Sequence, residues 1–135
     1  MIEDDMAVRD AMRTLLQRWG CEVVEGADAD ELDLQAKKLG WKTLPHALLV
    51  DQRLGAGKTG PAQARRLFEL WGAEVPVLIV SGESDLSPVK AAGWACLAKP
   101  LSPTLLMAWL VSVPILHRQF EVKARTHASA AGELP

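Results

Sequence analysis

The chain has 135 residues, a formal net charge of −2 at pH 7 and two cysteines. This length suits one domain that buries its core without disulfides or structural metals, and the scattered basic residues argue against nucleic acid as a partner. The longest apolar run, residues 105–116, is shorter than the ~20 residues of a membrane span. Because the N-terminus is acidic and lacks a secretory leader, we expect a cytoplasmic protein that does not enter the membrane.

Helical and extended segments alternate through the first half of the chain. Apolar residues at helical spacing predict a helix over residues 6–19, ended by Gly20. Residues 21–26 predict a short strand, and Asp28 followed by Glu31 predicts a capped second helix that runs to Leu39. The run 46–51 is apolar up to its last residue, as in a strand that is covered on both faces.

The same alternation continues in the second half. We predict a helix that begins at Pro61, a strand over 75–80, a short helix over 86–92, a strand over 94–98, and a helix opened by Ser102 and Pro103. Strands that alternate with helices indicate a parallel sheet with helices on both faces. The polar tail from Arg118 onward shows no such pattern, and we expect it to be loose.

The glycine-rich stretch GAGKTG after the 46–51 strand offers a competing hypothesis, a phosphate-binding loop. That motif needs a glycine five residues before the glycine of its Gly-Lys pair, and counting back from Gly57 reaches Gln52. The motif also needs its helix to begin at the Lys-Thr pair, whereas Gly60 and Pro61 delay the helix. The spacing therefore favours a plain loop.

Polar residues gather where the predicted strands end. Each has an ordinary explanation as a helix cap, a turn former or a solvated charge. The carboxyl ends of parallel strands meet in one crevice, however, so together these residues predict a site. The set is Glu3, Asp4 and Asp5 before the first helix, Asp51, Ser81, and Lys99 before Pro100.

The chemistry of this set suggests phosphoryl transfer. Clustered carboxylates suit a hard divalent cation such as Mg²⁺, which binds phosphate oxygens. Asp51 could act as the nucleophile toward phosphorus, while Lys99 supplies a positive charge and Ser81 a hydroxyl to the phosphoryl oxygens. The product would be an aspartyl phosphate. A hydrolase would also want a general acid two residues after the nucleophile, where Arg53 stands.

Four stretches, EDD, LLVDQRL, PVLIVSG and LAKPLSP, occur in this order. Over residues 1–113 they resemble the receiver (CheY-like) domains of two-component response regulators. The resemblance implies an α/β fold with a doubly wound, five-stranded parallel sheet of order 2-1-3-4-5. It implies Asp51 as phosphoacceptor, with Ser81 and Lys99 beside it and a cis bond before Pro100. It also implies Mg²⁺ held by Glu3, Asp4, Asp51 and the backbone carbonyl of Arg53, with no organic cofactor.

The function implied is a signalling switch, not a conventional enzyme. A histidine kinase or phosphotransfer protein would supply the phosphoryl group, protein contacts would change, and slow self-dephosphorylation would follow. The alternative is a pseudo-receiver that acts as a phosphorylation-independent interaction module. The motifs look most like the C-terminal receiver of a hybrid sensor kinase, and a stand-alone regulator remains open. Residues 114–135 would form a helical extension and tail.

Three features depart from the family. Cys96 stands where receivers carry an aromatic residue, and the interval from Ser81 to Lys99 leaves room only for a short helix. The first strand is truncated, because only Met1 and Ile2 precede the acids. Upstream residues, a swapped segment or the tail would then have to complete the sheet. The apolar helix after Ser102 suggests a contact with a second copy or with another part of a parent protein.

Overall fold

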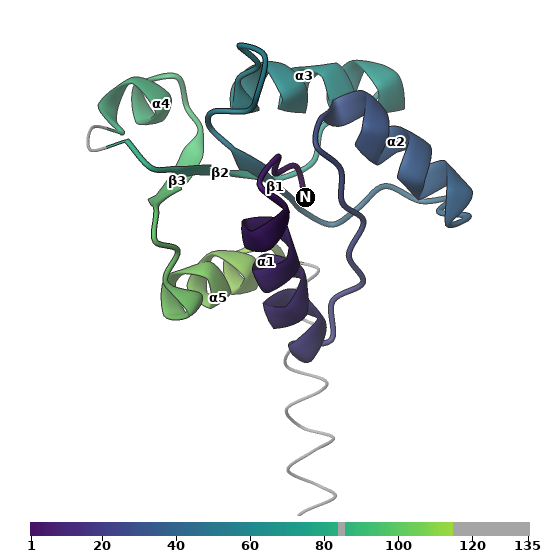
Figure 1. Cartoon of the computed structure of the whole chain (residues 1–135), viewed down its shortest axis with the longest axis horizontal. Coiled ribbons are helices and arrows are strands. Elements are labelled where there is room, and N and C mark those ends of the chain that lie inside the picture. The colour runs from purple at the N-terminus through teal and green to yellow at the C-terminus, as the bar shows by residue number, and fades with distance from the viewer. Residues whose placement is uncertain (84–85, 115–135) are drawn as a thin grey trace, which may run out of the picture.

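The computed structural model describes residues 1–83 and 86–114. Its elements alternate as the sequence predicts, with bounds within two residues of expectation for most of them (Figure 1). In chain order they are α1 (Met6–Arg18), α2 (Ala29–Lys38), β1 (Leu48–Asp51), α3 (Gly60–Trp71), β2 (Val77–Ser81), α4 (Ser87–Ala91), β3 (Ala95–Ala98) and α5 (Pro103–Ser112).

Four helices begin at a residue whose side chain accepts hydrogen bonds from the first turn. Asp5 accepts from the amides of Ala7 and Val8 at the start of α1. The three others are Asp28 before α2, Thr59 before α3 and Ser102 before α5. Such caps satisfy backbone donors that have no partner within the helix, which is why these helices start where they do. The capping of α2 by Asp28 was predicted from sequence.

The three strands form a parallel sheet of order β1-β2-β3. Ile2 extends it, because this residue makes parallel bridges to Val50 on one side and to Gly26 on the other. The segments therefore lie in the order 21–26, 1–3, β1, β2, β3, which is the predicted 2-1-3-4-5 order. Cys21 and Cys96 consequently stand on segments at opposite edges of the sheet.

Of two expectations about the first two strands, one is confirmed and one is wrong. Residues 21–26 form no regular strand and contribute a single bridge at Gly26. The first strand is truncated as predicted, with residues 1–3 in the part of its position next to the acidic residues. Ile2 donates to the Leu49 carbonyl at 2.8 Å, and its own carbonyl accepts from Asp51 at 3.0 Å. Among the residues that the structure describes, the segment 21–26 pairs with residues 1–3, too short a partner for a regular strand.

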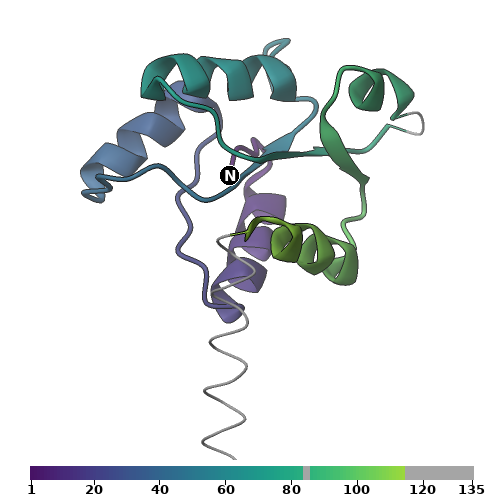
Figure 2. The same ribbon diagram turned by 180° about the vertical axis from the view of Figure 1, so that it is seen from behind.

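Helices cover both faces of the sheet (Figures 1 and 2). Alternate strand residues point to opposite faces. Leu48 and Val50 pack in one core with α2 and α3, whereas Leu49 packs in a second core with α1 and α5. Burial on both faces explains why the sequences of β1 and β2 are continuously apolar, whereas β3 at the edge is partly exposed. The doubly wound arrangement is thus confirmed.

Two further expectations concern the helices. In its described residues, the interval between β2 and β3 holds the five-residue α4, a short helix as predicted. No helix within the described part of the chain is long and apolar enough to cross a membrane. The predicted extension over 114–135 lies, apart from Pro114, outside the described residues.

Candidate functional site

The predicted polar residues meet at the carboxyl ends of the strands. Glu3 follows the bridging residue Ile2, Asp51 and Ser81 are the last residues of β1 and β2, and Lys99 follows β3. Three of them are buried although they are polar: Glu3 is 2%, Asp51 8% and Ser81 1% exposed. Buried polar groups of this kind cost free energy unless they are paired, so their gathering needs an explanation.

Three carboxylates form the centre of the site. One oxygen from each of Glu3, Asp4 and Asp51 lies within 4.8 Å of the others. Asp4 is the exposed member, and its Oδ2 accepts a hydrogen bond from the Gly55 amide at 2.9 Å. Oε1 of Glu3 accepts one from the Asp5 amide at 3.2 Å. The cluster thus joins the N-terminal segment to the loop after β1.

Lys99 lies between two of these acids. Its Nζ is 3.1 Å from Oδ2 of Asp51 and 3.3 Å from Oε2 of Glu3. The peptide bond to Pro100 is cis, as the resemblance implies, and the Lys99 amide donates to the Ser81 carbonyl at 2.7 Å. The backbone therefore holds the ammonium group over the buried acids.

Burial and neighbouring charges shift the pKa values of Glu3 and Lys99. Burial raises the pKa of the Glu3 carboxyl above its ordinary value, and the nearby Asp51 carboxylate raises it further. Burial alone would lower the pKa of Lys99, but its hydrogen bond to Asp51 and the charges of Asp51 and Glu3 outweigh burial and raise it. Lys99 thus stays charged, and it compensates the carboxylates only in part.

The third acid of the EDD stretch has a structural role. The Asp5 side chain caps α1 by accepting from Ala7 at 2.9 Å and Val8 at 3.1 Å. Asp5 is not among the metal ligands that the resemblance implies. Arg9, one turn into α1, donates to the backbone carbonyl of Glu3 at 3.3 Å and so ties the helix to the acidic segment.

The glycine-rich loop does not form a phosphate cradle. The helix begins at Gly60, after the Lys-Thr pair, and Lys58 is bound at 2.7 Å to Asp28. Gly60 is required for close packing, since a Cβ there would lie 2.5 Å from the Asp51 carbonyl oxygen. The start of α3 thereby approaches the end of β1 and fixes the position of Asp51.

One pair near the site was not foreseen. The Arg53 side chain, in the loop after β1, donates to and pairs with Glu83, which lies two residues beyond Ser81. The Glu83 amide also donates to the Ser81 hydroxyl at 3.1 Å. An acid directly after a predicted strand end was the available signal for Glu83. The use of the Arg53 carbonyl as a metal ligand remains a prediction.

The donor set fits a hard divalent cation. Three carboxylates from two segments converge, and oxygen ligands of this kind are those that Mg²⁺ prefers. The pKa of Glu3 is raised first by burial and then by the neighbouring Asp51 carboxylate, so the site disfavours a second uncompensated negative charge. A cation near Asp4, the exposed acid, would offset that charge and leave room for water ligands. The acidic cluster could therefore hold a metal.

Comparisons with known proteins address the fold. Neither a protein-family model nor a curated protein sequence matches the chain. Solved structures do match. Chemotaxis protein CheY4 of Vibrio cholerae is 24% identical with a TM-score of 0.68, covering 83% of this chain and 93% of its own.

Two further structures agree with that match. A CheY-like receiver domain protein of Methanospirillum hungatei is 22% identical with a TM-score of 0.66, over 87% of this chain and 94% of its own. The N-terminal domain of a response regulator/sensory box/GGDEF protein of Carboxydothermus hydrogenoformans is 20% identical with a TM-score of 0.64, over 91% and 95%. At these identities the likeness concerns architecture. The chain has the fold of the CheY-like receiver domains of response regulators.

Proposed function

We propose that the protein is a phosphoryl-accepting signalling switch in which Asp51 is the phosphoacceptor. The observation that carries the proposal is the convergence of Asp51 with two further acids and with Lys99 at one end of the sheet. A structural salt bridge would need one acid and one base, whereas three clustered carboxylates leave unbalanced charge. That imbalance suits a site that recruits a cation and a phosphoryl group.

In the proposed reaction an Asp51 carboxylate oxygen attacks the phosphorus of a phosphohistidine. The new O–P bond forms as the P–N bond breaks, and the electron pair of that bond stays on the leaving imidazole. Mg²⁺, when bound by Glu3, Asp4, Asp51 and the Arg53 carbonyl, would neutralise charge on the transferring group. The buried position of Asp51 limits access of water to the acyl phosphate.

Lys99 and Ser81 would act on the phosphoryl oxygens. The Lys99 ammonium pairs with Asp51 at 3.1 Å, so it is already placed beside the bond that would form. The Ser81 hydroxyl ends the neighbouring strand and can donate to an oxygen of the new group. Both residues stabilise charge that develops during transfer, and neither needs to take up a proton.

The resemblance to receiver domains supplies the partner and the setting of this proposal. A histidine kinase or a phosphotransfer protein would supply the phosphoryl group in the cytoplasm, and residues 1–113 would form the receiver unit. Slow self-dephosphorylation would return the switch to its resting state. The output would be a change in protein contacts at the surface around the site.

Labelling by a small acyl phosphate tests the proposal. The wild-type protein should take up one phosphoryl group per chain only when Mg²⁺ is present, and Asp51→Asn should take up none. Asp5→Asn is a matched control, because Asp5 caps α1 and should leave labelling unchanged. Absence of label on a folded wild-type protein would favour the pseudo-receiver alternative.

A second proposal concerns α5 as a contact for a second copy. Leu106 and Leu110 of this helix are buried in the domain, whereas Leu105 is 54% exposed. An exposed leucine on a helix that is apolar nearly all round suits a homodimer contact. Sedimentation should show a concentration-dependent dimer that Leu105→Glu abolishes. A wild-type protein that stays monomeric at high concentration would contradict this contact.

A further inference from the structure

The glycine-rich stretch after β1 forms a small hairpin. Arg53 and Thr59 make an antiparallel bridge across it. At the tip, Ala56 and Gly57 have φ values of 61° and 73°, and two positive values in succession are typical of tight hairpin turns. Residues 53–59, called hairpin 53–59 below, therefore have a defined backbone structure that the rejected phosphate cradle does not explain.

A bulge in this hairpin turns one amide outward. The Leu54 amide donates to the Lys58 carbonyl at 3.0 Å, and the Lys58 amide donates to the Gly55 carbonyl at 3.4 Å. Lys58 thus faces two residues, and the extra residue of such a bulge is left out of the ladder. The Gly55 amide donates instead to Oδ2 of Asp4 at 2.9 Å. The bulge therefore connects the hairpin to the exposed acid of the site.

The contact between Gly55 and Asp4 is close. A Cβ at position 55 would lie 3.3 Å from Oδ2 of Asp4, so any side chain there would have to displace the carboxylate by a few tenths of an ångström. The absence of a side chain at Gly55 thus lets the backbone amide reach the carboxylate directly.

Two contacts hold hairpin 53–59 against the rest of the domain. The Lys58 ammonium group binds Oδ2 of Asp28, the cap of α2, at 2.7 Å. The Leu54 side chain is 6% exposed and packs in the core with α2 and α3. The left-handed conformation of Ala56 is costly for a residue with a Cβ and agrees with a turn that such contacts fix.

The pairing pattern also explains how the Arg53 carbonyl can be a ligand. The ladder bonds of the hairpin lie one residue to either side of the Arg53–Thr59 bridge, at 3.0 Å and 2.9 Å. The two bridge residues are therefore a non-hydrogen-bonded pair, whose own carbonyls point away from the partner strand. The Arg53 carbonyl is thus not used inside the hairpin.

We propose that hairpin 53–59 is a positioning element for Mg²⁺. Its Gly55 amide orients the Asp4 carboxylate, and the pair of Lys58 with Asp28 holds that amide in place. The inference rests on the proposed function, because it concerns the same site. An exposed carboxylate loses rotamer freedom when it binds a cation, and an existing hydrogen bond lowers that cost. The glycine-rich stretch then serves a metal ion and not a nucleotide.

Charge alone predicts the opposite effect for Lys58. Removal of a positive charge near an acidic cluster favours the binding of another cation, by Coulomb's law. Release of the hairpin weakens the binding of Mg²⁺, because Asp4 loses its orientation. Lys58→Met therefore separates a positioning role from a purely electrostatic one by the sign of the change in Mg²⁺ affinity.

Titration calorimetry with Mg²⁺ and amide exchange in chelator test the proposal. Lys58→Met should raise the dissociation constant for Mg²⁺ about 10-fold, whereas Lys58→Arg, which keeps the ion pair, should change it less than about 2-fold. In chelator, the Gly55 amide should exchange about 10-fold faster in Lys58→Met, while exchange in α3 stays unchanged. This second measurement needs neither metal nor phosphoryl transfer.

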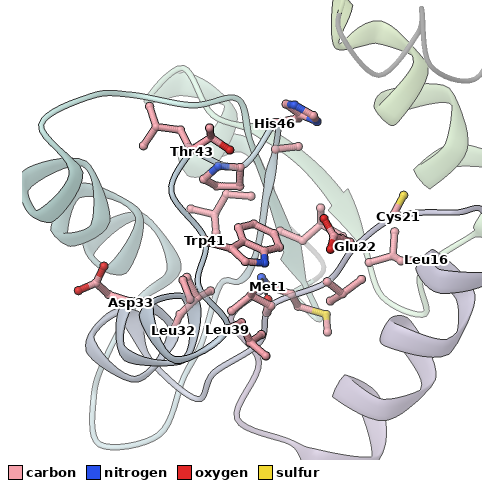
Figure 3. Close-up of a pocket in the computed structure, with 18 of the residues that line it drawn as sticks. Met1, Leu16, Cys21, Glu22, Leu32, Asp33, Leu39, Trp41, Thr43 and His46 are labelled. Atoms are coloured by element: carbon pink, nitrogen blue, oxygen red, sulfur yellow. Dashed lines mark hydrogen bonds between the residues drawn. The ribbon is translucent and has the colours of Figure 1, made fainter.

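Lys37→Met is the matched control. Lys37 also binds an acid of α2, Asp33 at 2.8 Å, but both residues lie at a cavity of about 860 Å³ beside Met1 (Figure 3). The described residues that line this cavity do not include residues 53–59. The control removes a lysine paired with the same helix without releasing the hairpin. It should leave Mg²⁺ affinity and Gly55 exchange as in the wild type.

The possible failures can be told apart. Mg²⁺ affinity in Lys58→Met that equals or exceeds that of the wild type would overturn the positioning role and leave the proposed function intact. Unchanged exchange of the Gly55 amide in this variant would overturn the positioning role as well. A folded wild-type protein that binds no Mg²⁺ would overturn both the proposed function and this inference.

Discussion

Asp51→Asn should stabilise the protein when no divalent cation is present. The substitution keeps the shape of the side chain and removes one of three clustered negative charges. At an effective dielectric constant of about 20, unit charges about 4.8 Å apart repel by about 3.5 kcal/mol, whereas opposite charges 3.1 Å apart attract by about 5 kcal/mol. Asp51 faces two acids and one ammonium group, so a repulsion of about 7 kcal/mol exceeds an attraction of about 5 kcal/mol.

The cost of burying the charge acts in the same direction as this net repulsion, so the change in the free energy of unfolding should be positive. Asp51 is only 8% exposed, and burial of a carboxylate costs several kcal/mol more than burial of an amide that keeps a hydrogen bond. We expect the free energy of unfolding to rise by about 1–2 kcal/mol. The rise is no larger because rearrangement of Lys99 offsets part of the gain. Urea denaturation in the presence of a chelator measures this change, and Tm should rise by roughly 5 °C.

The response to Mg²⁺ provides the second half of the experiment. At about ten times its dissociation constant, a bound cation adds about 1.4 kcal/mol to the stability of the wild type. Asp51→Asn should lose most of this gain. Asp30→Asn is a matched control, because Asp30 is an exposed acid on α2 paired with Arg66 at 3.2 Å, and its removal should change stability by less than about 0.5 kcal/mol. A destabilised Asp51→Asn protein with a full Mg²⁺ response would refute this account.

Three further changes test other parts of the structure. Lys99→Met should lower stability in chelator by about 2–3 kcal/mol and should tighten Mg²⁺ binding, measured by titration calorimetry, because it removes the charge that competes with the cation. Weaker Mg²⁺ binding would count against this. Arg53→Ala should slow labelling by an anionic acyl phosphate several-fold, since it leaves Glu83 unpaired near the site, and the additional change Glu83→Gln should restore the rate. An unchanged rate in the single variant would show that the pair has no influence. In a polypeptide that begins at Met1, burial lowers the pKa of the amine from 8.0 to about 5. As pH decreases, the unfolded state therefore binds a proton at this amine before the folded state does. The free energy of unfolding should fall as pH decreases from 8 to 5. The loss should approach about 4 kcal/mol relative to an N-acetylated chain in denaturation at each pH, and parallel pH profiles of the two would contradict it.

The sequence predicts most of the fold because β1 and β2 are buried on both faces. A continuously apolar run such as 46–51, with a polar last residue, identifies both the strand and the site at its end. Capping residues such as Asp28 and Ser102 locate the helix starts equally well. These signals are local, so they can be recognised without the tertiary structure.

The parts that sequence reasoning missed depend on contacts between distant segments. Residues 21–26 have the composition of a strand, but a strand needs a partner along its whole length, and only residues 1–3 supply one. The Arg53–Glu83 pair joins two loops whose proximity follows from the order of β1 and β2.

The most direct measurement is localisation of the phosphoryl group by peptide mass spectrometry after incubation with a small acyl phosphate. The account predicts a single modification, on Asp51, that forms with Mg²⁺ and is absent in chelator. Its hydrolysis should be slow enough for the peptide to be recovered under acidic conditions. Modification of another residue, or equal modification of Asp51 with and without a divalent cation, would contradict the assignment of this site.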